Sequence, residues 1–373
     1  MATMPFPLVS ISGSPLERGR QYGRQATDRI RRSVALYSGR LGKIGASERD
    51  LADMVGGYIP LIEAFDPAFI EEMKGIAEGA GLPFEQIVLI NARTEVLAKA
   101  RRRPAAQAEH SGEGCTGVVV LPERSASGEL IHAQNWDWMA ECAETAIVLR
   151  VRPDRGPSYQ TFTEAGGLAR SGMNDCGIAI TANYLESDRD FNQDGVPLSL
   201  IRRMVLQQEH MAMAMRAVAA TRKSASNNII VSHKDGFGVS FECAPDEAFN
   251  IYPENDLIVH ANHWQSPTAL LKLREQAHGS WSDSFYRDWR VRRELEKSDK
   301  IGVPEVKKAL ADTFGHPYSV CRPPHLSSRG HVSATVATIV MRPASGEMEL
   351  AVLPAENPEF TSYPAHAAGM AAE

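Results

Sequence analysis

The spacing of apolar residues changes once along the chain, near residue 114. Before this point, apolar side chains recur every three or four residues, which is typical of helices with one buried face. The clearest run contains Tyr22, Ile30, Val34, Tyr37 and Leu41. It follows Ser14-Pro15-Leu16-Glu17, which has the residue types of a capping box with proline in the first helical turn. We therefore expect residues 1–114 to form a mainly helical segment.

From residue 115 onward, short apolar runs bounded by turn residues predict β-strands. The runs "CTGVVVL" and "ELIHAQNW" are separated by the turn-rich "ERSASG", which favours an antiparallel hairpin. Further strands are expected at "TAIVLRVR", "GIAITANY", "NNIIVSH", "FGVSFEC", "LIVHANHW", "SATVATIVMR" and "MELAVL". Helical patterns interrupt them at roughly 197–222, 284–298 and 304–314. Hairpins with grouped helices indicate a layered α+β fold for residues 115–373.

The composition is that of an ordinary globular protein, with 43% hydrophobic and 23% charged residues among 373. A net charge of −6 and a pI of about 6.0 argue against nucleic acid as a partner, because phosphate binding needs a basic surface. The N-terminus lacks the pattern of a secretory signal, and no run reaches the ~18 apolar residues of a membrane span. We expect no membrane partner and a cytoplasmic location.

The cysteines and histidines show no metal-ligand spacing. Five cysteines, an odd number, indicate free thiols in a reducing compartment. His260 and His263 lie three residues apart in an expected strand, where their side chains would point to opposite faces. We therefore expect no bound metal and no cofactor, and a cysteine with a special role is expected to be catalytic.

Cys115 stands at the boundary between the two halves, directly after Gly114 and at the start of the first expected strand. Glycine leaves its carbonyl open to attack, and the preceding "RRRPAAQAEHSGEG" has the composition of a flexible loop. The thiol can attack the Gly114 carbonyl and form a thioester that water hydrolyses. The strand would then hold an N-terminal cysteine whose α-amino group, with a pKa of about 7.7–8.0, serves as its base.

The residues alone leave three alternatives open. In the first, Cys115 is a small apolar residue that packs in the core. In the second, the chain is an uncleaved cysteine hydrolase in which a histidine such as His132 acts as the base. In the third, the chain is a small-molecule-binding protein without catalytic activity.

Several segments, taken in order, resemble one protein family. "GCT", "AQNWDW", "GMNDCGIAITANYL", "VHANHW" and "SVCRPPHLSSRG" are similar to segments of the acyl-coenzyme A:6-aminopenicillanic acid acyltransferase family, peptidase family C45. The upstream "EEMKGIAEGAGLPFEQIVLINARTE" resembles its pro-segment, so the resemblance covers about Leu16 to Leu353. That family belongs to the N-terminal nucleophile hydrolases and is distantly similar to the bile salt hydrolases. The resemblance implies a four-layer αββα sandwich, with 1–114 as a pro-segment retained after cleavage and 115–373 as the catalytic chain.

The resemblance also implies roles for individual residues. Cys115 matches the nucleophile that is released by self-cleavage after Gly114. Asp137, 22 residues further on, matches the aspartate that orients the new α-amino group, a role that suits a carboxylate because it accepts hydrogen bonds from an amine. Asn262 matches the asparagine of the oxyanion hole. Asn183 resembles a second site asparagine of the bile salt hydrolase branch.

Further positions of the site follow from the same resemblance. Arg322 and Arg329 match two cationic positions near the nucleophile, where a cation lowers the pKa of a thiol and stabilises negative charge. Ser328 matches a neighbouring serine. The tryptophans on either side of the aspartate, Trp136 and Trp138, are expected to line the substrate site and to hold the carboxylate in place by packing.

Together these features predict an autoproteolytic amidohydrolase or acyltransferase that cleaves or transfers acyl groups of N-acyl amides through a thioester on Cys115. Its expected partners are a small-molecule amide or acyl donor and its own cleaved N-terminal chain. The sequence leaves open whether the chain also forms a homo-oligomer. One departure from the family is Gly117, which stands where the penicillin enzyme has threonine and puts hydroxyl-assisted cleavage at that position in doubt.

Overall fold

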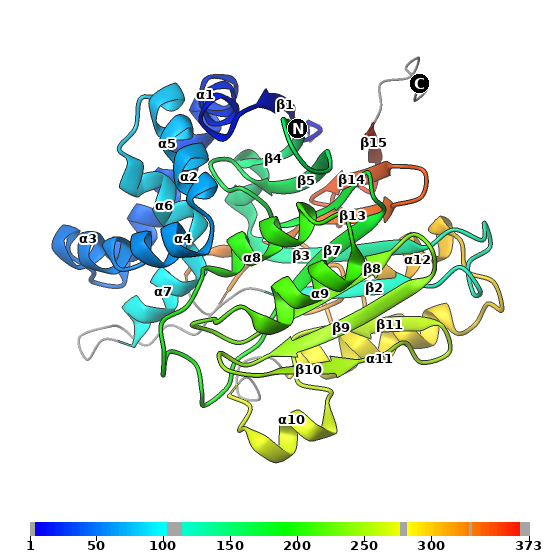
Figure 1. The fold of residues 1–373 in the computed structure, drawn as a ribbon. Coiled ribbons are helices and arrows are strands. Elements are labelled where there is room, and N and C mark those ends of the chain that lie inside the picture. The colour runs from blue at the N-terminus through cyan, green and yellow to red at the C-terminus, as the bar shows by residue number, and fades with distance from the viewer. Residues whose placement is uncertain (1–3, 103–113, 277–281, 328–329, 366–373) are drawn as a thin grey trace.

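Two β-sheets lie face to face in the computed structural model, which describes residues 4–102, 114–276, 282–327 and 330–365 (Figure 1). Within these ranges, the first sheet has eight strands, in the order β1 (Leu8–Gly13), β4 (Ala146–Pro153), β5 (Tyr159–Glu164), β6 (Ser171–Asn174), β7 (Ile178–Tyr184), β8 (Asn227–His233), β9 (Phe237–Cys243) and β10 (Ala248–Ile251). Over the same ranges, the second sheet has seven strands, in the order β11 (Leu257–His260), β2 (Gly114–Val120), β3 (Ile131–Met139), β13 (Val332–Arg342), β14 (Glu347–Val352) and β15 (Phe360–Pro364), with β12 (His325–Leu326) paired to β13.

Helices cover the outer faces of both sheets. The N-terminal helices are α1 (Pro15–Gln25), α2 (Thr27–Lys43), α3 (Glu48–Gly56), α4 (Ile59–Phe65), α5 (Pro67–Ala80), α6 (Phe84–Asn91) and α7 (Arg93–Arg101). The later helices are α8 (Leu198–Leu206), α9 (Met211–Ala220), α10 (Pro267–Lys272), α11 (Asp283–Leu295) and α12 (Val303–Leu310), with a 3-10 helix at Ala140–Glu144. Helices α1, α8 and α9 contact the first sheet, α11 and α12 contact the second, and β2 and β3 contact β7 between the sheets. The predicted αββα sandwich is therefore confirmed.

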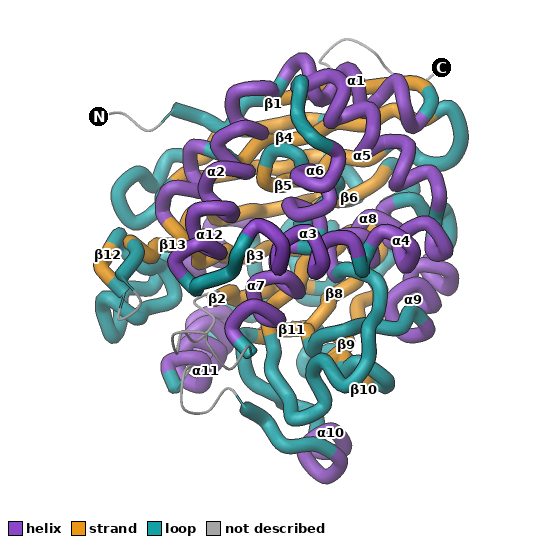
Figure 2. Tube along the Cα trace, turned by 90° about the vertical axis from the view of Figure 1, so that its left-hand side faces the viewer, coloured by secondary structure: helices purple, strands orange, loops and turns teal. Residues whose placement is uncertain are grey.

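The N-terminal helices form one group beside the sheets, and the segment that carries them also supplies a strand (Figures 1 and 2). Strand β1 pairs in parallel with β4 at the edge of the first sheet. Helices α1 and α5 approach closely because glycines face the partner backbone: a Cβ on Gly19 would lie 2.1 Å from the carbonyl oxygen of Glu72, and a Cβ on Gly23 would lie 2.4 Å from that of Ile76. The described part of the N-terminal segment is thus built into the sandwich through both strand pairing and helix packing.

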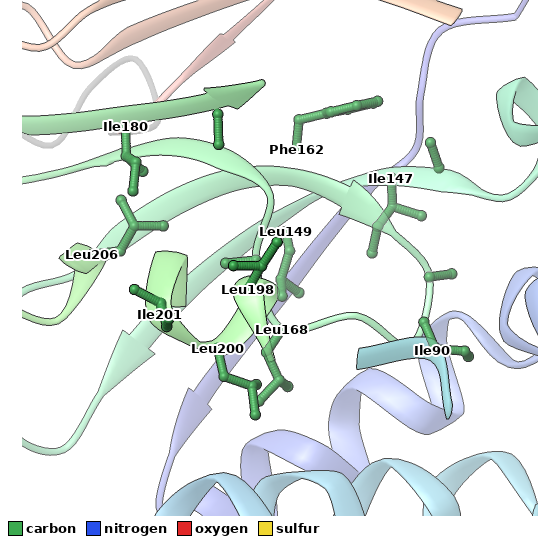
Figure 3. Close-up of a cluster of buried hydrophobic side chains, with 14 of the residues drawn as sticks. Ile90, Ile147, Leu149, Phe162, Leu168, Ile180, Leu198, Leu200, Ile201 and Leu206 are labelled. Atoms are coloured by element: carbon green, nitrogen blue, oxygen red, sulfur yellow. The ribbon is translucent and has the colours of Figure 1, made fainter. Parts of the chain in front are cut away.

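An apolar core joins α8 to the first sheet, as Figure 3 shows. Leu198, Ile201 and Leu206 of α8 belong to the same buried cluster as Leu149 and Ile180 of the sheet. Truncation of one such side chain to alanine costs ~2–5 kcal/mol, because a cavity is left behind. This packing holds α8 against the first sheet, and strand β7 of that sheet contacts β2, the strand that begins at Gly114 and Cys115.

Two local expectations in the N-terminal segment are wrong. Ser14 precedes α1 but makes no side-chain cap, while Glu17 accepts a hydrogen bond from Gln21 instead. The amphipathic run from Tyr22 to Leu41, expected to be continuous, is divided at Ala26 between α1 and α2. In the part of the chain that the structure describes, no helix is both long enough and apolar enough to cross a membrane.

Candidate active site

Cys115 is the second residue of β2, a strand held between β11 and β3 in the second sheet. Its register partner on β3 is Trp136, while Gly114 pairs with Asp137. Because side chains alternate along strands, Cys115 and Trp136 face the first sheet, whereas Asp137 faces the opposite side, toward the helices. Cys115 is 1% exposed, so its thiol is not open to solvent in the uncleaved chain.

Two polar side chains, those of Asn262 and Arg287, bind the backbone of Cys115. Its N–H donates to Asn262 Oδ1 at 2.9 Å, and its carbonyl oxygen accepts from Arg287 Nη1 at 2.8 Å. Arg287 Nη2 also donates to Asn262 Oδ1, at 2.8 Å. The amide nitrogen of Asn262 donates to the carbonyl oxygen of Tyr184 at 3.0 Å. The residue predicted as nucleophile and one predicted as its oxyanion donor are therefore in direct contact, through the carbonyl oxygen of Asn262.

Asp137 lies beside Gly114, on the other side of the bond expected to break. Its Oδ1 accepts from Thr335 Oγ1 at 2.7 Å, and its Oδ2 is 3.2 Å from Arg322 Nε. A Cβ on Gly114 would lie 2.8 Å from Asp137 Oδ2 and 3.1 Å from Arg322 Nη2. The ion pair thus occupies the space that any larger residue at position 114 would need. In the uncleaved chain the Cys115 N–H goes to Asn262, so the expected contact between Asp137 and the α-amino group stays a prediction.

The charges around Gly114 alternate in sign. Arg322 donates to Asp283 as well as contacting Asp137, and Arg287 Nε donates to Asp283 at 2.8 Å. Burial raises the pKa of Asp137 above its usual value, although Arg322 and Arg287 act in the opposite direction. Burial would also raise the pKa of Asp283, but the same two arginines outweigh it and hold that pKa below its usual value. The pKa values of the two carboxylates are therefore shifted in opposite directions: Asp283 accepts hydrogen bonds from both guanidinium groups, whereas Asp137 is the more deeply buried.

Asn183 connects the two sheets. Its Nδ2 donates to Asn228 Oδ1 at 3.1 Å and to the carbonyl oxygen of His260 at 2.9 Å, and its Oδ1 accepts from Gln134 Nε2 at 2.8 Å. It also lies next to Gly117, where a Cβ would meet Asn183 Nδ2 at 3.5 Å. The same Cβ would come within 2.7 Å of the Ile230 side chain, so the first sheet approaches the backbone closely at this glycine.

His132 is not placed to act as a base for Cys115. It lies opposite Val119, four residues along β2 from Cys115 and hence ~13 Å away at ~3.3 Å per residue. Its two ring nitrogens contact Ser232 Oγ and Thr181 Oγ1, both at 2.8 Å. Burial lowers the pKa of His132 to about 3, which keeps the imidazole neutral. This arrangement argues against the uncleaved hydrolase with His132 as its base.

The tryptophans do not hold the Asp137 carboxylate, contrary to expectation, because neighbours in a strand point to opposite faces. Trp136 packs edge-on against Phe162, with ring centroids 5.5 Å apart. The indole nitrogen of Trp138 donates to Tyr37 Oη of α2 at 3.1 Å. Both tryptophans are fully buried, and Trp138 contacts the N-terminal segment, so their expected place in a substrate site stays a prediction.

The two histidines of "HANHW" are closer together than expected. Their rings stack with centroids 6.3 Å apart, because β11 ends at His260 and the alternation rule does not extend to His263. His260 Nε2 contacts Glu242 Oε1 at 2.8 Å. Among the described residues, no group of three or more His, Cys, Asp or Glu side chains is placed to hold a metal ion.

Two further predicted site residues, Ser328 and Arg329, lie outside the described residues.

Sequence reasoning missed Arg287, Asp283 and Thr335. Arg287 lies in the expected helix 284–298, at helical spacing from Val291 and Leu295, which are both fully buried. This spacing indicates that the arginine shares their buried face. Asp283 stands four residues before it, a spacing at which opposite charges pair on a helix. The sequence therefore contained a signal, in these two spacings, that Arg287 is buried and paired.

Comparison with known proteins defines the class to which the chain belongs. The family model described as acyl-coenzyme A:6-aminopenicillanic acid acyl-transferase matches residues 124–356, which is more than half of the chain. The chain belongs to this family, and the resemblance found in the sequence is confirmed. The matched range contains Asp137, Asn262 and Arg322, and it begins after Cys115.

Individual relatives are similar over different lengths. The acyl-coenzyme A:6-aminopenicillanic-acid-acyltransferase 40 kDa form of Emericella nidulans is 27% identical over 323 residues, or 84% of each chain. The N-acylethanolamine-hydrolyzing acid amidase of Caenorhabditis elegans is 30% identical over 208 residues, which cover 52% of this chain and 55% of that protein. A solved structure of the Caenorhabditis elegans ortholog of N-acylethanolamine-hydrolyzing acid amidase matches with a TM-score of 0.45 at 18% identity, over 61% of this chain and 93% of that one.

Proposed function

We propose that this protein is a self-cleaving cysteine amidohydrolase or acyltransferase that acts on N-acyl amides through a thioester at Cys115. Family membership and the names of the two curated relatives, an acyltransferase and an acid amidase, support acyl transfer or amide cleavage. The observation that carries the proposal is the environment of the Gly114–Cys115 bond. Asn262 binds the nitrogen of this bond, and the Asp137–Arg322 pair lies against the residue on its other side.

Maturation uses the Cys115 thiol as the nucleophile. Its sulfur bonds to the Gly114 carbonyl carbon, the C–N bond breaks, and the thiol proton goes to the nitrogen, which leaves as an amine. Water then hydrolyses the thioester, giving a Gly114 carboxylate and a free Cys115 thiol. Because Asn262 Oδ1 already accepts the N–H of Cys115, it remains an acceptor for the released amine.

In turnover, the α-amino group takes the thiol proton, and the thiolate attacks the acyl carbonyl of an amide. Asp137 orients the amine, and Arg322 supplies positive charge nearby. The amide nitrogen of Asn262 carries two hydrogens; one binds the carbonyl oxygen of Tyr184, and the second donates to the oxyanion. The leaving amine takes the proton from the α-amino group, and water or another amine then attacks the thioester. Exclusion of water selects transfer over hydrolysis.

The cleaved N-terminal chain remains bound as one half of a heterodimer. Strand β1 stays paired with β4, and Arg93 Nε forms a buried ion pair with Glu164 at 2.7 Å. Tyr22 Oη donates to the carbonyl oxygen of Gly167 at 3.1 Å and accepts from the N–H of Gly166 at 2.9 Å. None of these contacts involves Gly114 or Cys115, so cleavage of the bond between these two residues leaves them in place.

A panel of N-acyl amides tests the activity. Released amine is measured for the wild type, for Cys115→Ala and for Cys176→Ser, a matched control at a partly exposed cysteine. We expect turnover by the wild type and the control and none by Cys115→Ala. Acid-quenched wild type should carry the acyl group on the C-terminal chain, seen as added mass. Turnover that persists in Cys115→Ala would exclude the thioester mechanism.

A further inference from the structure

Arg287 is fully buried on α11, and its guanidinium group donates to the carbonyl oxygen of the candidate nucleophile, Cys115. We propose that Arg287 is a positioning residue: it fixes the orientation of the Asn262 amide and the backbone of Cys115, and so sets the geometry for self-cleavage. This inference rests on the proposed function, and it concerns a residue for which the sequence suggested no role.

The guanidinium group uses each of its three nitrogens. Nε donates to Asp283 Oδ2 at 2.8 Å, on the preceding turn of the same helix. Nη1 donates to the carbonyl oxygen of Cys115 at 2.8 Å and to Thr116 Oγ1 at 2.9 Å, and Nη2 donates to Asn262 Oδ1 at 2.8 Å. A planar, rigid fork of donors suits this arrangement, and the single nitrogen of lysine cannot reproduce it.

These contacts determine which way the Asn262 amide points. An arginine can only donate hydrogen bonds, so the atom of Asn262 that faces Arg287 must be the carbonyl oxygen. The same oxygen accepts the Cys115 N–H, and the NH₂ group on the other side meets the carbonyl oxygen of Tyr184. A reversed amide would place its NH₂ group against two donors, Arg287 and the Cys115 N–H. Every polar neighbour therefore favours one orientation.

Helix α11 holds Asn262 at a second point. The backbone N–H of Asn262 donates to Ser284 Oγ at 2.7 Å, one turn before Arg287. With Asn262 fixed, the N–H of Cys115 has a defined acceptor, and Arg287 binds the carbonyl oxygen of the same residue. The backbone of Cys115 is thus held at both its nitrogen and its carbonyl oxygen. The direction from its sulfur to the Gly114 carbonyl follows from this constraint, because near-attack geometry depends on such positioning.

Self-cleavage itself provides the test, because it needs no identified substrate. Wild type, Arg287→Lys and Arg290→Lys are freshly translated, and the rate at which the full-length chain disappears is followed by mass spectrometry. Arg290 is the matched control: it lies on α11 and pairs with Asp312 at 2.7 and 2.6 Å, away from Cys115. We expect Arg287→Lys to cleave at least about tenfold more slowly, because the fork is lost, and Arg290→Lys to cleave within about twofold of wild type.

A rescue experiment separates positioning from folding. Millimolar guanidinium, compared with equal sodium chloride, should speed cleavage of Arg287→Ala at least about threefold and leave the wild type unchanged. Three results would overturn the inference: Arg287→Lys cleaving at the wild-type rate, Arg290→Lys slowed equally, or Arg287→Lys failing to fold, which would give Arg287 a structural role. Absence of cleavage in the wild type would instead contradict the proposed function.

Discussion

Two carboxylates, Glu72 and Asp283, each lie between two arginines, and only Asp283 shares one of its arginines with Cys115. Glu72, in the helical layer, contacts Arg18 at 2.7 Å and Arg203 at 3.0 Å. These residues come from α5, α1 and α8, and Arg18 also donates to the carbonyl oxygen of Gly13 at 2.6 Å. The Glu72 network therefore joins the N-terminal helices to the rest of the molecule.

Asp283 has the same pattern of partners and a different set of neighbours. Its two arginines, Arg287 and Arg322, each reach further, one to the carbonyl oxygen of Cys115 and the other to Asp137 beside Gly114. Pairing is alike in the two networks, and Glu72 is the more buried carboxylate, with 1% of its side chain exposed against 12% for Asp283, so neither property identifies an active site by itself. The difference lies in the remaining donors of the arginines: Arg18 binds the carbonyl oxygen of Gly13 at the end of β1 in one network, and Arg287 binds the backbone of the candidate nucleophile in the other.

The largest expected effect separates the two networks by stability. Glu72→Gln removes the charge between Arg18 and Arg203 and leaves two buried cations, which should lower the free energy of unfolding by about 3–5 kcal/mol. Denaturant unfolding of the purified protein measures the loss. Cleavage per folded molecule should match the wild type, and a stable variant that fails to cleave would give Glu72 a role at the site.

The second effect concerns turnover. Asp137→Asn keeps the shape of the side chain and removes the charge that we propose orients the amine, so we expect turnover to fall by at least about 100-fold with folding largely kept. Kinetics and thermal unfolding are measured on the same preparation. A variant that unfolds well below the wild type, or one that stays folded with near-normal turnover, would make Asp137 a structural residue.

The third effect concerns the space beside the ion pair. In Gly114→Ala, the new methyl group meets Asp137 Oδ2 at 2.8 Å, so the pair must shift, and we expect self-cleavage to slow by about tenfold. Gly39→Ala is the control, because a Cβ there meets nothing within 4 Å. Time-resolved gels compare the two variants. Equal cleavage rates would show that the glycine is not required by its surroundings.

Part of this arrangement could be predicted from the sequence. The hairpin that carries Cys115 and Asp137 was clear because both strands are apolar and a turn-rich segment joins them. Strand β1 was missed although Val9 and Ile11 alternate with exposed neighbours, since a single edge strand before a helix gives a short signal. The error about Trp136 and Trp138 was avoidable, because the period of two already places Asp137 on the other face.

Arg287 could not be placed from the sequence in the same way. Helical spacing indicates that it is buried, but its contact with Cys115 joins residues 172 positions apart. Such a contact depends on how α11 packs against β2, which is a property of the tertiary structure. The resemblance to a family identified Asn262 and Arg322 as candidates. The structure adds Arg287, which donates to Asn262, and Asp283, which links Arg287 to Arg322.

The smallest effect extends the comparison to Glu95, a buried carboxylate that accepts a backbone hydrogen bond. Burial raises the pKa of Glu95 to about 7, although it accepts a hydrogen bond from the N–H of Leu198 at 2.8 Å. The folded state therefore binds this proton more tightly than the unfolded state, and the stabilisation is lost as pH rises from about 4.5 to about 7. Between pH 5 and pH 8, wild type should lose at least about 1 kcal/mol more stability than Glu95→Gln. Identical pH dependence in denaturant unfolding would contradict this assignment.

Intact-mass spectrometry of the purified protein tests the central claim most directly. Cleavage after Gly114 divides 373 residues into 114 and 259, so the 40.8 kDa chain should appear under denaturing conditions as chains of about 12 and about 28 kDa. The larger chain should begin with Cys115, the two chains should elute together natively, and Cys115→Ala should remain a single chain. A wild-type protein that is fully active as one 40.8 kDa chain would contradict self-cleavage and the N-terminal nucleophile with it.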